Sequence, residues 1–410
     1  MNVARNNQIS NSGLHGGNFR KLPAGIWILG FVSMFMDISS ELIHSLLPVF
    51  MVSVLGASMT TIGVIEGVAE AAAAFTRIFS GMLSDYFRKR KLLAAAGYGL
   101  SALTKPLFPL AASITWVFAG RFLDRIGKGI RGAPRDALVA ELVPGNLRGA
   151  AFGLRQALDS AGAFIGPLFA VLFMFLFADK IRSVLWIAVI PATLAFFLLL
   201  FGVHDPEDGR ASGTKTPAIS MERIRQLPRR FTAVVVLGGI FTLARFSEAF
   251  LLLRGSGTGL EPVYIPLVMI AMNLVYTISA YPAGSAADRG RQHHLLVTGL
   301  IALLTSDVIL ALATRPWHVF AGAAMWGLHL GLTQGLFSKL VADSTTSAIR
   351  GTAFGIFNFV SGGALLLASI LAGSLWSAYG APFTFFAGAF LVLVCLAGLL
   401  FYRKLPSILH

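Results

Sequence analysis

The stretch Arg148-Gly149-Ala150-Ala151-Phe152-Gly153 occurs a second time, 202 residues later, as Arg350-Gly351-Thr352-Ala353-Phe354-Gly355. At the same separation, Leu138-Val139-Ala140-Glu141 precedes the first copy and Leu340-Val341-Ala342-Asp343 the second. A further pair, Gly81 to Asp85 and Gly284 to Asp288, lies 203 residues apart. These repeats predict that one unit of roughly 200 residues is used twice in the fold.

The composition predicts a protein that spans a membrane. Hydrophobic residues make up 56% of the 410 residues and charged residues only 13%, unlike ordinary soluble domains. At about 1.5 Å per residue, roughly 20 apolar residues cross a hydrocarbon core of about 30 Å. Twelve spans fit the sequence: 24–54, 60–80, 92–111, 114–136, 149–177, 184–203, 231–253, 262–282, 294–313, 317–337, 352–376 and 382–402. The single Cys395 excludes a disulfide framework and a cysteine metal cluster.

The net charge of +14 is explained by basic residues on one side of the membrane. Lys and Arg gather in alternate loops, all on one side of the twelve spans: 88–91, 131–148, 210–230, 289–291, 339–350 and 403–404. Such loops face the cytoplasm. We therefore expect both termini in the cytoplasm, a multi-pass protein of the inner (cytoplasmic) membrane with the lipid bilayer as its partner, and no nucleic-acid binding.

The same pattern predicts the domain organisation. A cytoplasmic tail (1–23) precedes a six-helix bundle (24–203), a cytoplasmic linker (204–230), a second six-helix bundle (231–402) and a short tail (403–410). The linker contains Pro206, Gly209 and Pro217, which break regular structure. The expected fold class is an all-α membrane protein of twelve transmembrane helices in two pseudo-symmetric six-helix bundles. Duplicated halves in a membrane protein are typical of a transporter that binds substrate between them.

Several motifs resemble signatures of the major facilitator superfamily. Gly81-Met82-Leu83-Ser84-Asp85, with Lys89-Arg90 behind it, is similar to the signature between the second and third helices, and 284–289 to its weaker copy. Arg125-Ile126-Gly127-Lys128-Gly129 resembles the fourth-helix signature, and 162–167 the fifth-helix signature of antiporters. Residues 124–138 also resemble an exporter-like bacterial subgroup. Tyr86 and Arg88 depart from the usual Arg and Gly. The resemblance covers essentially the whole chain and implies the major facilitator fold.

The resemblance assigns gating roles to these motifs. A carboxylate such as Asp85 at a helix end can pair with a nearby arginine or cap a facing helix, which stabilises one state of a two-state gate. Small residues four apart let two helices approach closely, and proline loosens the hydrogen-bond ladder of its own helix. The expected gating residues are Gly81, Asp85, Arg90, Gly284, Asp288, Arg289, Gly162, Gly166 and Pro167.

Charged residues inside the spans are candidates for ion coupling, because a charge in a membrane is costly unless it has a function or a partner. They concentrate in the first half. Asp37, Glu41 and His44 share one helix face, and Asp37 has no basic residue within a turn, so it is the first choice for binding a proton or cation. The expected coupling residues are Asp37, Glu41, Glu70, Arg125 and Asp159.

Local pairing is the alternative for several of these charges. Arg155 with Asp159, Arg245 with Glu248, and Asp124 with Lys128 are each within one helical turn and can satisfy each other. Glu66 and Glu70 are like charges on one face, which need Arg77 or another helix for compensation. If the resemblance holds, the first, fourth, seventh and tenth helices line the cavity. The expected cavity residues are His44, Arg121, Arg245, Phe246, Trp326, His329 and Gln334.

The leading functional hypothesis is proton-coupled efflux of a small organic molecule by alternating access, carried out by a monomer without a cofactor or bound metal. A divalent-cation exporter is one alternative, because Asp37, Glu41, His44 and Glu70 offer oxygen and nitrogen ligands. Proton-coupled uptake is another. An enzyme is not expected, because the sequence lacks a catalytic or phosphate-binding motif.

Overall fold

The computed structural model describes residues 22–87, 89–144, 147–203, 228–333, 336–345 and 350–404, in which all regular structure is helical. The first half contains α1 (Ala24–Ser53), α2 (Met59–Phe87), α3 (Arg90–Thr104) with the 3-10 turn η2 (Lys105–Leu107), α4 (Ile114–Glu141), α5 (Arg148–Leu176), α6 (Ile181–Ile187) and α7 (Val189–Gly202). The second half contains α9 (Arg229–Leu243), α10 (Ala249–Gly257), η4 (Pro262–Tyr264), α11 (Pro266–Asp288), α12 (Gln292–Ala311), α13 (Pro316–Thr333), α14 (Leu336–Asp343), α15 (Arg350–Tyr379) and α16 (Ala381–Lys404). These helices form the predicted twelve crossings.

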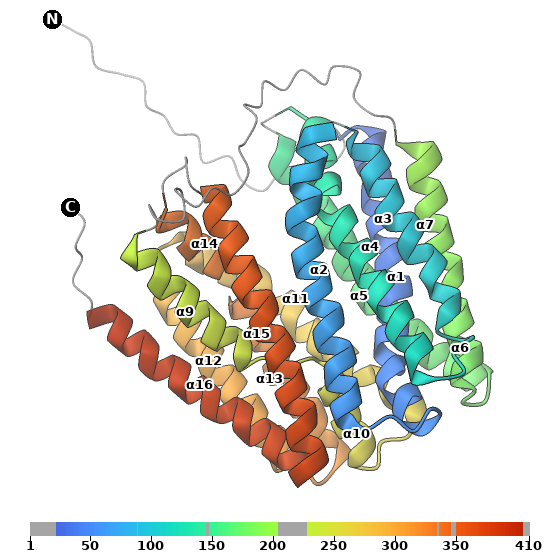
Figure 1. Cartoon of the computed structure of the whole chain (residues 1–410), viewed down its shortest axis with the longest axis vertical. Coiled ribbons are helices and arrows are strands. Elements are labelled where there is room, and N and C mark those ends of the chain that lie inside the picture. Colours follow the sequence, from blue (N-terminus) through green and yellow to red (C-terminus); the bar gives the residue numbers. More distant parts are fainter. Residues whose placement is uncertain are drawn as a thin grey trace, which may run out of the picture.

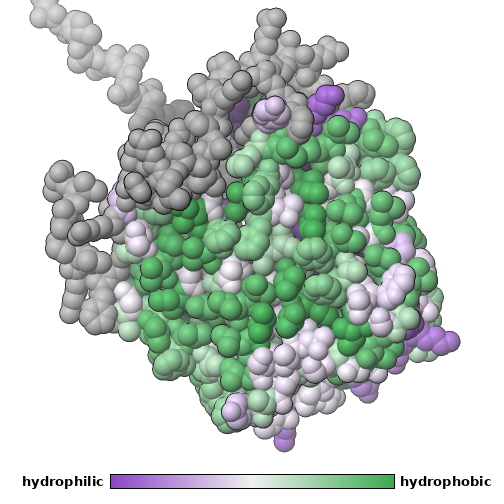
Figure 2. Space-filling view, viewed as in Figure 1, coloured by the Kyte–Doolittle hydropathy of each residue, from purple (hydrophilic) through white to green (hydrophobic). Residues whose placement is uncertain are grey.

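The surface of the molecule is suited to lipid. Large apolar side chains such as Phe79, Leu103 and Phe201 are more than half exposed on the outside of the bundle. Figure 2 shows a broad hydrophobic surface across the middle of the molecule, with hydrophilic residues gathered toward its ends. Exposed apolar area on this scale is not stable in water but is stable against lipid tails.

Seven crossings in the described residues are long and apolar enough, by length and composition, to be recognised as membrane spans. They are Ala24–Ser53, Arg148–Leu176, Ile181–Gly202, Pro262–Ala287, Gln292–Ala311, Ala353–Tyr379 and Ala381–Leu399. Among the other five, α2 and α4 carry internal charges, α3 is short, and α9 and α10 are separated at residues 244–248; α13 and α14 are described on either side of residues 334–335. The charged crossings α2 and α4 carry the ion pairs between Glu66 and Arg121 and between Glu70 and Arg125.

The helix bounds depart from the predicted spans in informative places. α2 continues to Phe87 and α4 to Glu141, beyond the predicted ends at 80 and 136, so Asp136 lies inside a helix and not at its end. The seventh crossing is interrupted at residues 244–248, where Arg245 lies. The predicted domain bounds 24–203 and 231–402 stay a prediction, because residues 1–21, 204–227 and 405–410 of the tails and linker lie outside the described residues.

The two halves lie side by side, with α2 and α15 adjacent between them (Figure 1). Thr60, at the beginning of α2, donates through its backbone N–H and its hydroxyl to Ser377 Oγ of α15, at 3.1 and 3.0 Å. The rings of Phe175 in α5 and Tyr264 in η4 lie 5.8 Å apart. These contacts join the halves at the end of the molecule where α2 begins and α15 ends.

Candidate functional site

Two ion pairs connect α2 and α4 like the rungs of a ladder. Arg121 donates from Nε and Nη2 to the two carboxylate oxygens of Glu66, at 3.1 and 2.7 Å, and both side chains are fully buried. One turn along both helices, Arg125 Nη2 lies 2.8 Å from Glu70 Oε1. α4 thus supplies the positive charges that compensate Glu66 and Glu70 of α2. We call these four residues the α2–α4 ladder.

A histidine connects the ladder to α1. His44 Nε2 lies 3.9 Å from Glu66 Oε2, and its Nδ1 lies 3.6 Å from Glu41 Oε2. His44 is buried and Glu41 is partly exposed. His44 thus lies between carboxylates of two helices and connects α1 with α2.

A further buried pair corrects one prediction. Lys105 Nζ donates to Asp124 Oδ1 at 2.9 Å and to Ser40 Oγ at 3.1 Å. Asp124 therefore pairs with a lysine 19 residues before it, at the end of α3, and not with Lys128 of its own helix. The pairing through the helix turn was wrong because Lys128 points elsewhere: its side chain is exposed and interacts electrostatically with Arg125, Glu70 and Asp37.

The acids of α1 lie directly against the small residues of α5. A methyl group built on Gly162 would lie 2.6 Å from the Met34 carbonyl oxygen and 3.0 Å from Asp37 Cβ. One built on Gly166 would lie 2.9 Å from Glu41 Cβ. Only glycine allows this approach, so these two glycines position the carboxylates of Asp37 and Glu41. Pro167, the next residue of α5, is buried in the same bundle.

Asp37 differs from the other acids of the first half. Its side chain is partly exposed, and among the described residues it has neither a hydrogen bond nor an ion pair. Among the charged groups, Asp159, Lys128 and Arg131 influence it most strongly. A carboxylate with like and opposite charges nearby, but no dedicated cation, can gain or lose a proton with little rearrangement.

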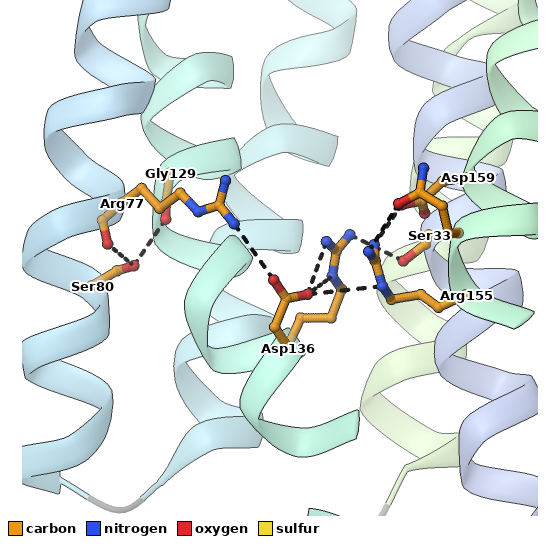
Figure 3. Close-up of polar contacts among 9 residues, drawn as sticks. Ser33, Arg77, Ser80, Gly129, Asp136, Arg155 and Asp159 are labelled. Carbon is orange, nitrogen blue, oxygen red and sulfur yellow. Dashed lines mark hydrogen bonds and ion pairs between the residues drawn. The ribbon is translucent and has the colours of Figure 1, made fainter. Parts of the chain in front are cut away.

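A second cluster of charges, at the inner part of the first half, is centred on Asp136 of α4 (Figure 3). Arg77 of α2, Arg135 of α4 and Arg155 of α5 lie 3.5, 3.2 and 3.9 Å from its carboxylate. Arg155 also pairs with Asp159, which confirms the pair expected within α5. The sequence reasoning missed Asp136, although its position beside Arg135 in a helix-compatible stretch is the signal that could have indicated it.

Arg77 contributes little to the stability of this inner cluster, because 61% of its side chain is exposed. We expect Arg77→Ala to lower the free energy of unfolding by less than about 1 kcal/mol, as is usual for an exposed ion pair. Thermal unfolding of the purified protein in detergent measures this change. A loss as large as that of a buried pair would show that Arg77 holds Asp136 much more tightly than its exposure indicates.

The seventh crossing brings one more pair of charges to the middle of the molecule. Arg245 and Glu248 lie at the break between α9 and α10, and both are partly exposed. No ion pair between them is present in the described residues; Arg245 instead lies 5.8 Å from the centre of the Phe241 ring. Glu248 interacts electrostatically with His44, Glu41 and Arg245, so this segment faces the acids of α1 from the second half.

Several expected cavity residues are enclosed in this arrangement. Arg121 is held by Glu66, and Phe246, Trp326 and His329 are buried in the second half, where the tilted rings of Phe246 and Trp326 lie 5.5 Å apart. His329 Nδ1 lies 2.9 Å from the Gly299 carbonyl oxygen. Gln334 lies outside the described residues. The role of these five residues in substrate binding stays a prediction.

The expected gating residues are placed unevenly. Arg90 Nη1, at the start of α3, lies 2.6 Å from Glu141 Oε1 at the end of α4, and Gly81 packs near Ala133. In the second half, Arg289 is exposed and Gly284 has open space around it. The side chains of Asp85 and Asp288 lie outside the described residues, so the gate contacts assigned to them stay a prediction.

Comparison with known proteins agrees with this architecture. The family model of the Major Facilitator Superfamily matches residues 28–270 and 249–409. An uncharacterised MFS-type transporter from Methanocaldococcus jannaschii is 31% identical over 408 residues, 98% of this chain and 97% of the relative. A class C tetracycline resistance protein from Escherichia coli is 24% identical over 330 residues, 78% of this chain and 81% of that protein. A mutant of the nucleoside transporter NupG has a TM-score of 0.76 and 14% identity, with 92% of this chain and 99% of that chain covered.

Helical crossings in two halves, with buried ion pairs inside the first half, define a multi-pass membrane transporter. The match of the family model over nearly the whole sequence identifies the family as well. The chain belongs to the Major Facilitator Superfamily, which confirms the resemblance seen in its motifs.

Proposed function

We propose that this transporter exports a small organic molecule in exchange for protons. The observation that carries the proposal is the partly exposed Asp37, which has no ion pair among the described residues and is pressed against Gly162 of the antiporter-like α5 motif. An acid in this position can bind either a proton or a cationic group of the substrate. Competition of the two for one carboxylate is sufficient for exchange.

The contacts between the halves support alternating access as the mechanism. The Thr60–Ser377 and Phe175–Tyr264 contacts lie at the end where α2 begins, and packing of α2 on α15 continues from there as far as Phe75 and Phe359. With both termini in the cytoplasm, as the basic loops predict, that end faces outward and the molecule is closed on the outside. Asp37 and Glu41 then release protons to the cytoplasm in this state, and rocking of the halves would expose both acids to the outside, where they bind protons again.

The test uses purified protein in liposomes that contain a pH-sensitive dye. A thermal-stability screen first identifies compounds that raise the melting temperature, since ligands of the folded state stabilise it by mass action; tetracycline is the first compound to test because of the related resistance protein. We expect a stabilising compound to drive proton movement in the wild type and not in Asp37→Asn. Glu261→Gln, in an exposed loop, is the matched control.

An unchanged rate and an unchanged pH dependence in Asp37→Asn would refute the coupling role of this residue. Compound movement without any proton movement in the wild type would refute antiport itself. Reversing the imposed gradients distinguishes export from uptake. No specific observation favours the divalent-cation alternative. The described residues contain no group of three or more His, Cys, Asp or Glu arranged to hold a metal ion.

A further inference from the structure

A carboxyl group without a partner lies in the interior of the second half. Asp307 of α12 is 0% exposed, and neither of its side-chain oxygens has a hydrogen-bond partner among the described residues. A methyl group built on Gly388 of α16 would lie 2.7 Å from Asp307 Oδ2 and 3.1 Å from Phe246 Cε1. The carboxyl group is therefore packed between a helix backbone and an aromatic ring, where water does not reach it.

The internal repeat shows what this position holds in the first half. α3 begins at Arg90 and α12 at Gln292, and α4 begins at Ile114 and α13 at Pro316, so both helix pairs are related by 202 residues. At that separation Asp307 corresponds to Lys105, and Trp326 corresponds to Asp124. The first half thus has a buried ion pair at 2.9 Å, whereas the second half has an acid at one of the two positions and a tryptophan at the other.

The tryptophan does not replace the missing cation. Trp326 is uncharged, and its indole N–H is itself without a hydrogen-bond partner in the described part of the chain. One turn further along α13, His329 Nδ1 lies against the Gly299 carbonyl oxygen. Arg245, next to Phe246, lies by the Phe241 ring. No charged group of α11, α13, α16 or the 244–248 segment interacts electrostatically with Asp307 among the described residues.

An ionised carboxylate in such a site would be an uncompensated buried charge, which is far less favourable than the neutral acid. We propose that Asp307 is a proton-binding site of the second half and that its carboxyl group carries a proton in this arrangement of the helices. Phe246, which covers it, lies at the break between α9 and α10. Movement of this break is the route by which Asp307 would reach the cavity and release its proton. The site does not depend on the proposed efflux function, since the acid can hold a proton whatever the chain transports.

Infrared spectroscopy of the purified protein in lipid tests the proposal directly. A protonated carboxylic acid has a carbonyl stretching band separate from that of a carboxylate, and we expect Asp307→Asn to remove such a band at neutral pH. We also expect this variant to keep the melting temperature of the wild type, because an amide replaces a neutral acid of nearly the same shape. Asp307→Leu, an apolar replacement, must remove the same band.

The repeat offers a matched control in Asp124→Asn. This variant leaves Lys105 as an unpaired buried cation, so we expect a clear fall in melting temperature and no loss of the protonated-acid band. If Asp307→Asn removes no band, or destabilises the protein as strongly as Asp124→Asn, then Asp307 is an ionised and compensated residue and the proposal is wrong. These measurements need no substrate, so they are independent of the outcome for Asp37.

Discussion

Replacing Glu66 by Gln is expected to lower the free energy of unfolding by about 3–5 kcal/mol, because it leaves the Arg121 guanidinium buried without its carboxylate. Both side chains are fully enclosed between α2 and α4, and two hydrogen bonds of 3.1 and 2.7 Å connect them. Unfolding of the purified protein in detergent, followed by heat or denaturant, measures the change.

A double-mutant cycle separates the ion pair from other effects of the substitution. Glu66→Gln combined with Arg121→Met removes both charges, and we expect it to recover a large part of the stability lost in either single variant. Arg77→Ala, at the exposed pair with Asp136, is the control for an ion pair in contact with solvent. If the losses of stability in the two single variants simply add in the double variant, Glu66 and Arg121 act separately and do not form a stabilising pair.

The fold was predictable because each apolar span is one contiguous segment and because the repeat can be read directly from the sequence. Each span needs only about 20 apolar residues, and the alternation of basic loops orders the spans. What the sequence does not contain is the neighbour of each helix. The break at 244–248 was not predicted, since the apolar segment that includes it continues on both sides.

The same distinction explains the candidate site. Arg155 and Asp159 were paired correctly because both lie on one helix. Asp124 was assigned to Lys128 on the same argument, but its partner comes from the end of α3. The α2–α4 ladder does have a sequence signal: two acids four residues apart in one span and two arginines four apart in another. Their register depends on helix packing, which spacing alone does not determine.

The two halves have the same helix arrangement but different charged residues at corresponding positions, as the repeat and the structure show together. Lys105 and Asp124 form a buried ion pair, whereas their counterparts Asp307 and Trp326 do not. The proton-binding site proposed at Asp307 would make the second half responsive to protons. On that proposal, the asymmetry of charge between the halves is a division of labour in which ion handling is not confined to the first half.

The contact between α1 and α5 is expected to be intolerant of a single methyl group. We expect Gly162→Ala or Gly166→Ala to lower the free energy of unfolding by about 1–3 kcal/mol, as is usual for overpacking, because the new carbon would meet backbone atoms of α1 at 2.6–2.7 Å. Backbone atoms cannot rotate aside, so α1 must shift, and Asp37 and Glu41 shift with it. Transport by the folded protein should therefore fall as well.

Two glycines of the same helix provide the control for this experiment. Gly149 and Gly153 have open space where a methyl group would be added, so Gly149→Ala and Gly153→Ala should be neutral or stabilise α5 by up to about 1 kcal/mol through helix propensity. Melting temperature and transport rate per folded molecule are compared across the four variants. If Gly162→Ala and Gly166→Ala behave like these controls, α1 and α5 do not need their close approach, and the positions of Asp37 and Glu41 are set by other contacts. If transport falls only in Gly162→Ala and Gly166→Ala, these two glycines hold the acids of α1 where exchange requires them.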